Sequence, residues 1–109
     1  MKPRRLARLT APLALALTLA ACRDEAALDP AAERGRQVYL GQCTACHSSD
    51  PAQRGTLGPP VKGSSRQLLE ARVLRGAYPP GYAPKQNTRL MQPMPQLSGS
   101  LEDLAAYLR

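Results

Sequence analysis

Three side chains that can do chemistry stand within five positions of the chain, Cys43, Cys46 and His47, in the order Cys-x-x-Cys-His. Thiols three residues apart lie about one helical turn from each other on the same face. They can therefore add to the two vinyl groups along one edge of a porphyrin. The imidazole of the next residue, His47, would then lie under the ring, where a neutral nitrogen can ligate iron. The motif predicts one haem c, attached covalently through Cys43 and Cys46.

Three other uses of these residues fit the sequence less well. A structural zinc site normally takes four Cys or His ligands, whereas the chain has three cysteines and one histidine in total. A thioredoxin-like redox pair needs neighbouring strands, and no strand pattern flanks the motif. A structural disulfide between Cys43 and Cys46 would leave His47 without a role.

The first 22 residues have the pattern of a bacterial export signal. Basic residues open the chain, and an apolar stretch from Leu9 to Ala21, short for a membrane span, follows them. The stretch ends in Leu19-Ala20-Ala21-Cys22, which resembles the lipobox, in which the cysteine is lipidated and becomes the mature N-terminus. The alternative is ordinary signal-peptidase cleavage that leaves Cys22 as a free thiol, a liability in an exported protein.

These patterns predict a division of the chain into three parts. We expect a lipoprotein signal peptide at 1–21, a lipidated Cys22 with a short tether over 22–29, and one folded domain over 30–109. The protein would then be held by its lipid on the periplasmic side of a bacterial membrane. All three cysteines have a use in this interpretation, so we expect no disulfide.

Composition limits the partners and the size of the core. The net charge of +7 includes four cations in residues 1–21 and no acid there, so the mature chain carries only +3. Without Phe or Trp and with only four Tyr, the chain lacks the basic surface interleaved with aromatics that binds nucleic acid, and no such partner is expected. A mature chain of 88 residues buries little apolar surface, so an embedded porphyrin would form much of its core.

Three helices are predicted to position the motif. Asp29 as N-cap and Pro30 at the first position predict a helix that runs to about Gly41. In this helix Gly35, Val38 and Tyr39 form one face, and Gly35 leaves room for another helix to cross closely.

The second helix is expected from Ser64 or Ser65 to Gly76, with a capping serine at its start and glycine as its stop. The third starts near Ser98 or Ser100, with Asp103 completing a capping box from Ser100. Residues 48–63 and the Pro-rich residues 77–96 are predicted loops, and the second is long enough to wrap the distal side of a haem.

Four segments, in this order, resemble the class I c-type cytochromes, which are small single-haem electron carriers. The likeness covers residues 30–109, and it implies an all-α fold with three or more helices around one haem. The matching segments are Gly35-Arg36-Gln37-Val38-Tyr39, the Cys43–His47 motif, Gly58-Pro59-Pro60-Val61-Lys62-Gly63, and Leu101-Glu102-Asp103-Leu104-Ala105-Ala106-Tyr107-Leu108.

The resemblance also implies the surroundings of the iron. The carbonyl of Pro59 would accept a hydrogen bond from the ring N–H of His47, and a methionine would be the sixth ligand. Met91 is favoured by its distance from the last helix, and Met94, which lies only four residues before Ser98, is the alternative. A second histidine ligand is excluded because His47 is the only one, whereas Lys62, Lys85 or an open site remain as further alternatives.

A closed, six-coordinate iron favours a monomeric electron carrier over an enzyme. It would pass electrons between periplasmic or membrane redox proteins that dock transiently at the haem edge. Tyr82 and Arg89 are candidates for binding the haem propionates. The alternatives are a gas sensor or small haem enzyme with an open or labile sixth site, and an accessory subunit with one fixed partner. Seven cations could rim the haem edge and attract acidic partners: Arg36, Lys62, Arg66, Arg72, Arg75, Lys85 and Arg89.

Overall fold

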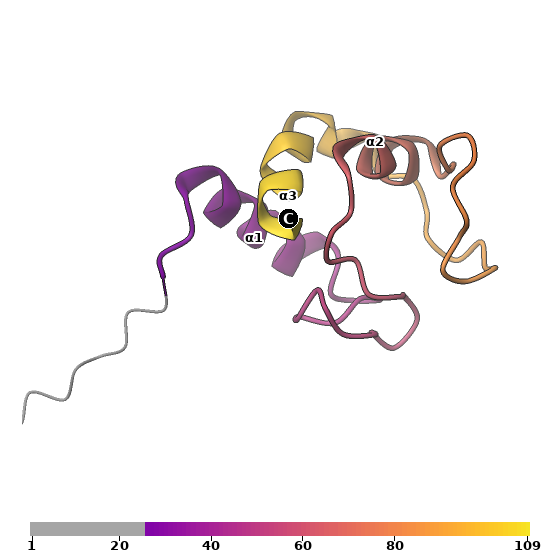
Figure 1. Ribbon diagram of the computed structural model, residues 1–109, viewed down its shortest axis with the longest axis horizontal. Helices are drawn as coiled ribbons and strands as arrows, with labels where there is room; N and C mark the ends of the chain where they lie inside the picture. Colours follow the sequence, from indigo (N-terminus) through magenta and orange to yellow (C-terminus); the bar gives the residue numbers. More distant parts are fainter. Residues whose placement is uncertain (1–25) are drawn as a thin grey trace, which may run out of the picture.

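The computed structural model describes residues 26–109, which are helical and contain no strand. Helices α1 (Pro30–Gln42) and α3 (Leu101–Leu108) lie side by side, with α2 (Arg66–Leu69) next to α3 (Figure 1). A π-helical turn, Glu70–Leu74, continues α2, and a 3₁₀ segment, Pro95–Ser100, leads into α3. The predicted all-α class is confirmed for this part of the chain.

The N-terminal predictions fall on residues that the structure does not describe. The signal peptide at 1–21 and the lipidation site Cys22 lie outside residues 26–109, as does the first part of the tether. Within residues 26–109, no helix is long and apolar enough to cross a membrane.

Helix α1 begins as its sequence predicts. A side-chain oxygen of Asp29 accepts a hydrogen bond from the Ala32 N–H at 2.9 Å, and Pro30 occupies the first turn, where a missing N–H costs nothing. Glu33 in the same turn complements the positive end of the helix dipole. The helix ends at Gln42, one residue beyond the predicted Gly41.

Helix α1 crosses close to α3 at Gly35. A Cβ atom at this position would lie 1.9 Å from the backbone oxygen of Asp103 and 2.9 Å from Cβ of Tyr107. The rings of Tyr39 and Tyr107 meet next to the crossing, with 5.5 Å between their centroids. The predicted role of Gly35, to let another helix approach, is therefore confirmed.

The second helix has the predicted ends and an unpredicted interior. Ser65 Oγ accepts a hydrogen bond from the Leu68 N–H at 3.1 Å, and Gly76 ends the helix with a φ of +65°. Between them, Glu70–Leu74 forms a π-helical turn, and the Ala77 N–H donates to the Ala71 carbonyl across Gly76. Nothing in the apolar spacing indicated this wider turn.

The predicted capping box at the start of α3 is wrong. The Ser100 side chain makes no capping hydrogen bond, because the 3₁₀ segment runs directly into the helix. The Asp103 carboxylate instead accepts two hydrogen bonds from Arg34 on α1, at 2.8 and 3.0 Å. The apolar stripe of α3 is as predicted, with Leu101, Leu104 and Leu108 buried.

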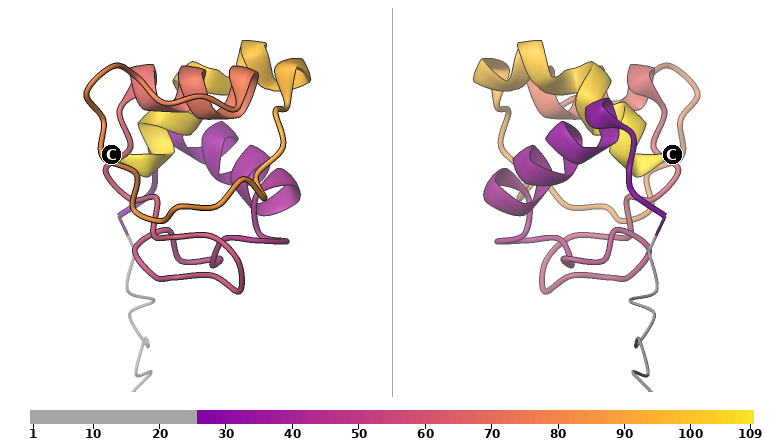
Figure 2. Two further views of the ribbon diagram at one scale, coloured as in Figure 1. Left: turned by 90° about the vertical axis from the view of Figure 1, so that its right-hand side faces the viewer. Right: turned by 90° about the vertical axis from the view of Figure 1, so that its left-hand side faces the viewer.

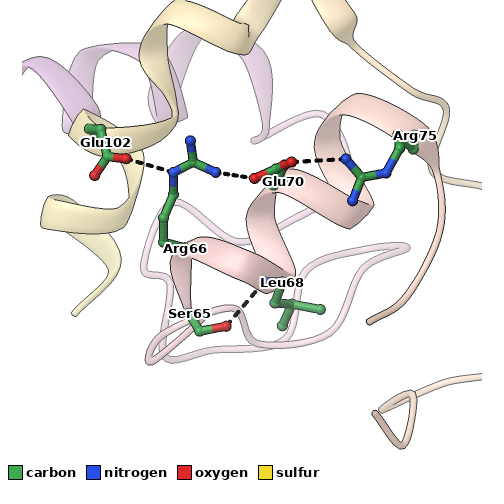
Figure 3. Close-up of polar contacts among 6 residues, drawn as sticks. All are labelled: Ser65, Arg66, Leu68, Glu70, Arg75 and Glu102. Carbon is green, nitrogen blue, oxygen red and sulfur yellow. Dashed lines mark hydrogen bonds and ion pairs between the residues drawn. The ribbon is translucent and has the colours of Figure 1, made fainter. Parts of the chain in front are cut away.

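The core is small, and surface ion pairs join the helices around it. Arg66 at the start of α2 contacts Glu70 at 2.5 Å and Glu102 of α3 at 2.6 Å, and Arg75 also contacts Glu70 (Figure 3). Exposed pairs of this kind contribute little to stability, because water and salt screen their charges. The buried core residues are Tyr39, Leu69, Val73, Leu97, Leu101, Leu104 and Leu108.

Replacing Gly35 with alanine should separate the two helices. Because the added Cβ meets backbone, which cannot rotate away, we expect Gly35→Ala to lower the free energy of unfolding by roughly 2–3 kcal/mol. Gly41→Ala is the matched control, since a Cβ at Gly41 of the same helix meets nothing within 4 Å. Denaturant unfolding of the holoprotein should show no loss, or a gain of about 0.5–1 kcal/mol, for Gly41→Ala. Equal effects of the two substitutions would contradict the close crossing.

Candidate functional site

The Cys–His segment continues directly from the end of α1. The Cys43 N–H donates to the Tyr39 carbonyl, and the His47 N–H donates to the Cys43 carbonyl, both at 2.9 Å. Cys43 and Cys46 are half-buried and are not joined by a disulfide. Burial raises the pKa of the Cys43 thiol to about 11. The turn thus presents two thiols and an imidazole within one short segment.

Tyr39 fastens this segment to the helix core. Its side chain is 1% exposed, and its hydroxyl donates a hydrogen bond to the carbonyl of Ser48, the residue after His47, at 2.6 Å. Burial raises the pKa of the phenol to about 12, because the charged form would lose its water. The hydroxyl therefore remains protonated and holds the end of the motif in place.

A loop folded against the motif orients His47. The Leu57 and Gly58 N–H groups both donate to the Cys46 carbonyl, at 3.1 and 2.9 Å. The next residue, Pro59, places its carbonyl oxygen 2.9 Å from Nδ1 of His47. A Cβ at Gly58 would lie 2.5 Å from the imidazole ring, so only glycine allows the loop to come this close. With Nδ1–H donating to Pro59, the lone pair of Nε2 is free to bind a metal.

Two adjoining hollows open on His47, with cavity volumes of about 110 and 260 Å³. Cys43 lines the larger one, whereas Cys46 and His47 line both. Apart from Cys46 and His47, the residues that line both hollows are apolar. Such a wall suits a flat hydrophobic ring. The other residues common to both hollows are Val61, Leu69, Val73, Leu90 and Met91.

Both candidate methionines lie at this site. Met91 lines both hollows together with His47, whereas Met94 lines only the larger one. The two lysines considered as alternative iron ligands are less well placed than the methionines. Lys85 lines the smaller hollow, but its Nζ donates to the Pro60 carbonyl at 2.7 Å, and Lys62 is exposed and lines neither.

The smaller hollow has a polar side that the sequence did not reveal. The guanidinium of Arg72 lies 4.3 Å from the centre of the Tyr78 ring, which stacks on Tyr82 at 5.4 Å. Gln86 Oε1 is buried there without a hydrogen-bond partner. Of the two predicted propionate ligands, Tyr82 lines this hollow and Arg89 does not. Nothing in the sequence indicated that Arg72, on the helix before this loop, would line the hollow while other cations would not.

The donor set fits a haem bound through its edge and one axial nitrogen. Two thiols, an oriented imidazole, an apolar wall and a cationic side with one orphaned buried oxygen surround the same space. Along residues 26–109, no group of three His, Cys, Asp or Glu side chains could hold a metal ion by itself, without a porphyrin.

The comparisons with known proteins agree with this geometry. The family model described as Cytochrome c matches residues 32–109, which include every residue of the site. Comparisons with curated proteins and with solved structures give no match. The resemblance seen in the sequence is thereby confirmed.

Tyr39→Phe should remove both a hydrogen bond and a pH dependence. The folded phenol has a pKa of about 12 and the unfolded one a pKa of 10.0, so its contribution is complete below pH 10 and is lost as the pH rises towards 12. Urea unfolding should show Tyr39→Phe about 1 kcal/mol less stable at pH 7, with a smaller fall between pH 10 and 12. The control Tyr107→Phe keeps the Tyr39 hydroxyl and should retain the wild-type fall. If the free energy of unfolding of Tyr39→Phe falls as steeply between pH 10 and 12 as that of the wild type, Tyr39 is not the source of this pH dependence.

Proposed function

The chain belongs to the cytochrome c family, and we propose that it transfers single electrons between redox proteins on the periplasmic side of a bacterial membrane. Members of this family are haem-binding electron carriers, and this chain binds one haem c covalently through Cys43 and Cys46. The haem iron supplies a one-electron couple. The donors, acceptors and location belong to our proposal.

The observation that carries the proposal is the shared wall of the two hollows. His47 and Met91 both line both hollows, and the ring of His47 is already oriented by Pro59. With His47 and Met91 as its ligands, the iron would have a closed coordination shell and a comparatively high potential. We therefore assign His47 and Met91 as the metal ligands, with Met94 as the alternative to Met91.

The carrier role also agrees with what surrounds the site. Its walls carry no Asp or Glu along residues 26–109, so no carboxylate is placed there to move a proton. The chain's own residues would then bind the ring, orient the histidine and keep water from the iron. These are the tasks that outer-sphere electron transfer requires, since no bond to a substrate forms or breaks.

Substituting the two methionines separately tests the closed iron. We expect Met91→Ala to abolish the weak near-infrared sulfur-to-iron band and to convert low-spin haem to high-spin haem, while Met94→Ala keeps both features. The measurement is an optical spectrum of each holoprotein, made with the haem-attachment machinery, before and after addition of CO. A low-spin wild type that loses its band only in Met94→Ala would move the ligand to Met94. A high-spin wild type that binds CO readily would replace the carrier with a sensor or a small haem enzyme.

The cations at the hollows support docking of acidic redox partners. Of the seven cations that the sequence offered, Arg36, Arg66 and Arg75 are in ion pairs with Glu33, Glu70 and Glu102. Of the other four, Arg72 and Lys85 line the smaller hollow, whereas Lys62 and Arg89 are exposed and are only sequence neighbours of lining residues, Val61 for Lys62 and Thr88 and Leu90 for Arg89. We propose that these four attract the partner to the haem edge.

Removing one charge from this surface should slow a reaction with an anion. We expect Lys85→Gln to lower the rate of reduction by ferrocyanide roughly two- to threefold at low ionic strength, with the effect vanishing in high salt. Arg34→Gln removes the same charge at a position that lines neither hollow and is paired with Asp103, and it should change the rate little. Lys85→Arg should keep the wild-type rate. Equal slowing by both glutamine variants would show that only the net charge matters.

The proposed location rests on the sequence of residues 1–22. A signal peptide at 1–21 and a lipid at Cys22 would hold the domain near a bilayer through the short tether over 22–29. Electrons would then be exchanged with partners at the membrane surface, by short-range contact of a monomer.

A further inference from the structure

The segment that carries the candidate methionines is attached to the helices at one backbone hydrogen bond. The Met94 N–H donates to the carbonyl of Val73, in the π-helical turn, at 2.6 Å. The loop before this point runs away from the helices and returns to them at the 3₁₀ segment (Figure 2). Lys85 and Gln86 fix the outer part of the loop to the carbonyls of Pro60 and Leu57. Met94 is therefore where the returning chain meets the helix that ends at Gly76.

The π-helical turn leaves the Val73 carbonyl free for this contact. In a continuing α-helix that carbonyl would accept the N–H of residue 77. Here the Ala77 N–H donates to Ala71, the Gly76 N–H donates to Arg72, and the Arg75 N–H is shared by Ala71 and Arg72. The Met94 N–H thus satisfies a carbonyl at the end of the helix that has no helical partner.

A second contact stands beside the first. Gly76 has a φ of +65°, and a Cβ atom on it would lie 3.1 Å from Cγ of Pro93 and 3.5 Å from its Cδ. The backbone at Gly76 therefore lies against the Pro93 ring, which would have to shift by a few tenths of an ångström to admit a Cβ atom. Together, Val73 and Gly76 on one side and Pro93 and Met94 on the other form what we call the clasp.

We propose that the clasp is a positioning device, which holds residues 91–94 against the hollow and sets how readily the Met91 sulfur leaves the iron. This proposal rests on the proposed function, in which Met91 is the sixth ligand. Three residues of chain reach at most about 10 Å, so an anchor at Met94 confines Met91 without fixing it. Loosening the clasp should increase the fraction of molecules whose iron is open to an external ligand.

Imidazole titration of the ferric holoprotein measures that fraction, because a neutral ligand binds only when the sulfur is off. Gly76→Ala strains the backbone and pushes on Pro93, and Met94→Pro removes the N–H. For each variant we expect the apparent affinity for imidazole to rise roughly three- to tenfold, with the near-infrared band still present in the absence of imidazole.

Two controls separate the clasp from general destabilisation. Gly63→Ala places alanine at an equally left-handed φ of +81° where a Cβ meets nothing within 4 Å, and it should bind imidazole with wild-type affinity. Met94→Leu keeps the N–H at position 94, so its affinity for imidazole should be lower than that of Met94→Pro. Both results are expected if the clasp acts through the Val73 and Gly76 contacts.

The remaining outcomes overturn the proposal in distinguishable ways. Wild-type imidazole affinity in both Gly76→Ala and Met94→Pro, with a low-spin wild type, would remove the clasp and leave the carrier function standing. If the affinity for imidazole rises as much in Gly63→Ala as in Gly76→Ala, the effect comes from lower overall stability and not from the clasp. Loss of the sulfur-to-iron band in Met94→Leu would make Met94 a ligand instead of an anchor. A high-spin wild type would overturn the clasp and the carrier function together.

Discussion

The crossing of α1 over α3 at Gly35 is the contact on which the site depends. It brings the backbones so close that a methyl group could not be inserted, and it presses the Tyr39 ring against Tyr107. The Cys–His turn leaves from the end of α1, so the crossing fixes where the thiols and the imidazole begin. On the other side of the same contact, Leu104 and Leu108 of α3 line the larger hollow. One steric constraint thus determines both the start of the motif and a wall of the cavity.

The two sides of the domain differ in how their charges are used. On the helical side, Arg34, Arg36, Arg66 and Arg75 each have a carboxylate partner, and two of these pairs, Arg34–Asp103 and Arg66–Glu102, join different helices. At the hollows, no carboxylate is among the lining residues within 26–109, so no lining acid there offsets the positive charge of Arg72 and Lys85. A net charge of only +3 over residues 22–109 is therefore compatible with the directed attraction that we propose.

Local signals were enough to predict much of this protein from its sequence. The Cys43–His47 spacing predicts the thioether chemistry, Asp29 and Pro30 the start of α1, and Ser65 and Gly76 the ends of the second helix, because each depends on residues within one or two turns. The contact between His47 and Pro59, implied by the family resemblance, is present at 2.9 Å. The capping box at Ser100 failed although its pattern was correct, since Asp103 has a stronger partner in Arg34, 69 positions away in the chain.

The sequence by itself determined the cofactor chemistry and the helical class, because the spacing within one short segment decides which groups can reach one ring. Only the tertiary structure decided that Arg34 and Arg66 pair with carboxylates of α3 and that the Val73 carbonyl meets the Met94 N–H. Each of these depends on segments far apart in sequence that become neighbours only after packing. A pattern within one segment carries no information about the partner that another segment will bring to it.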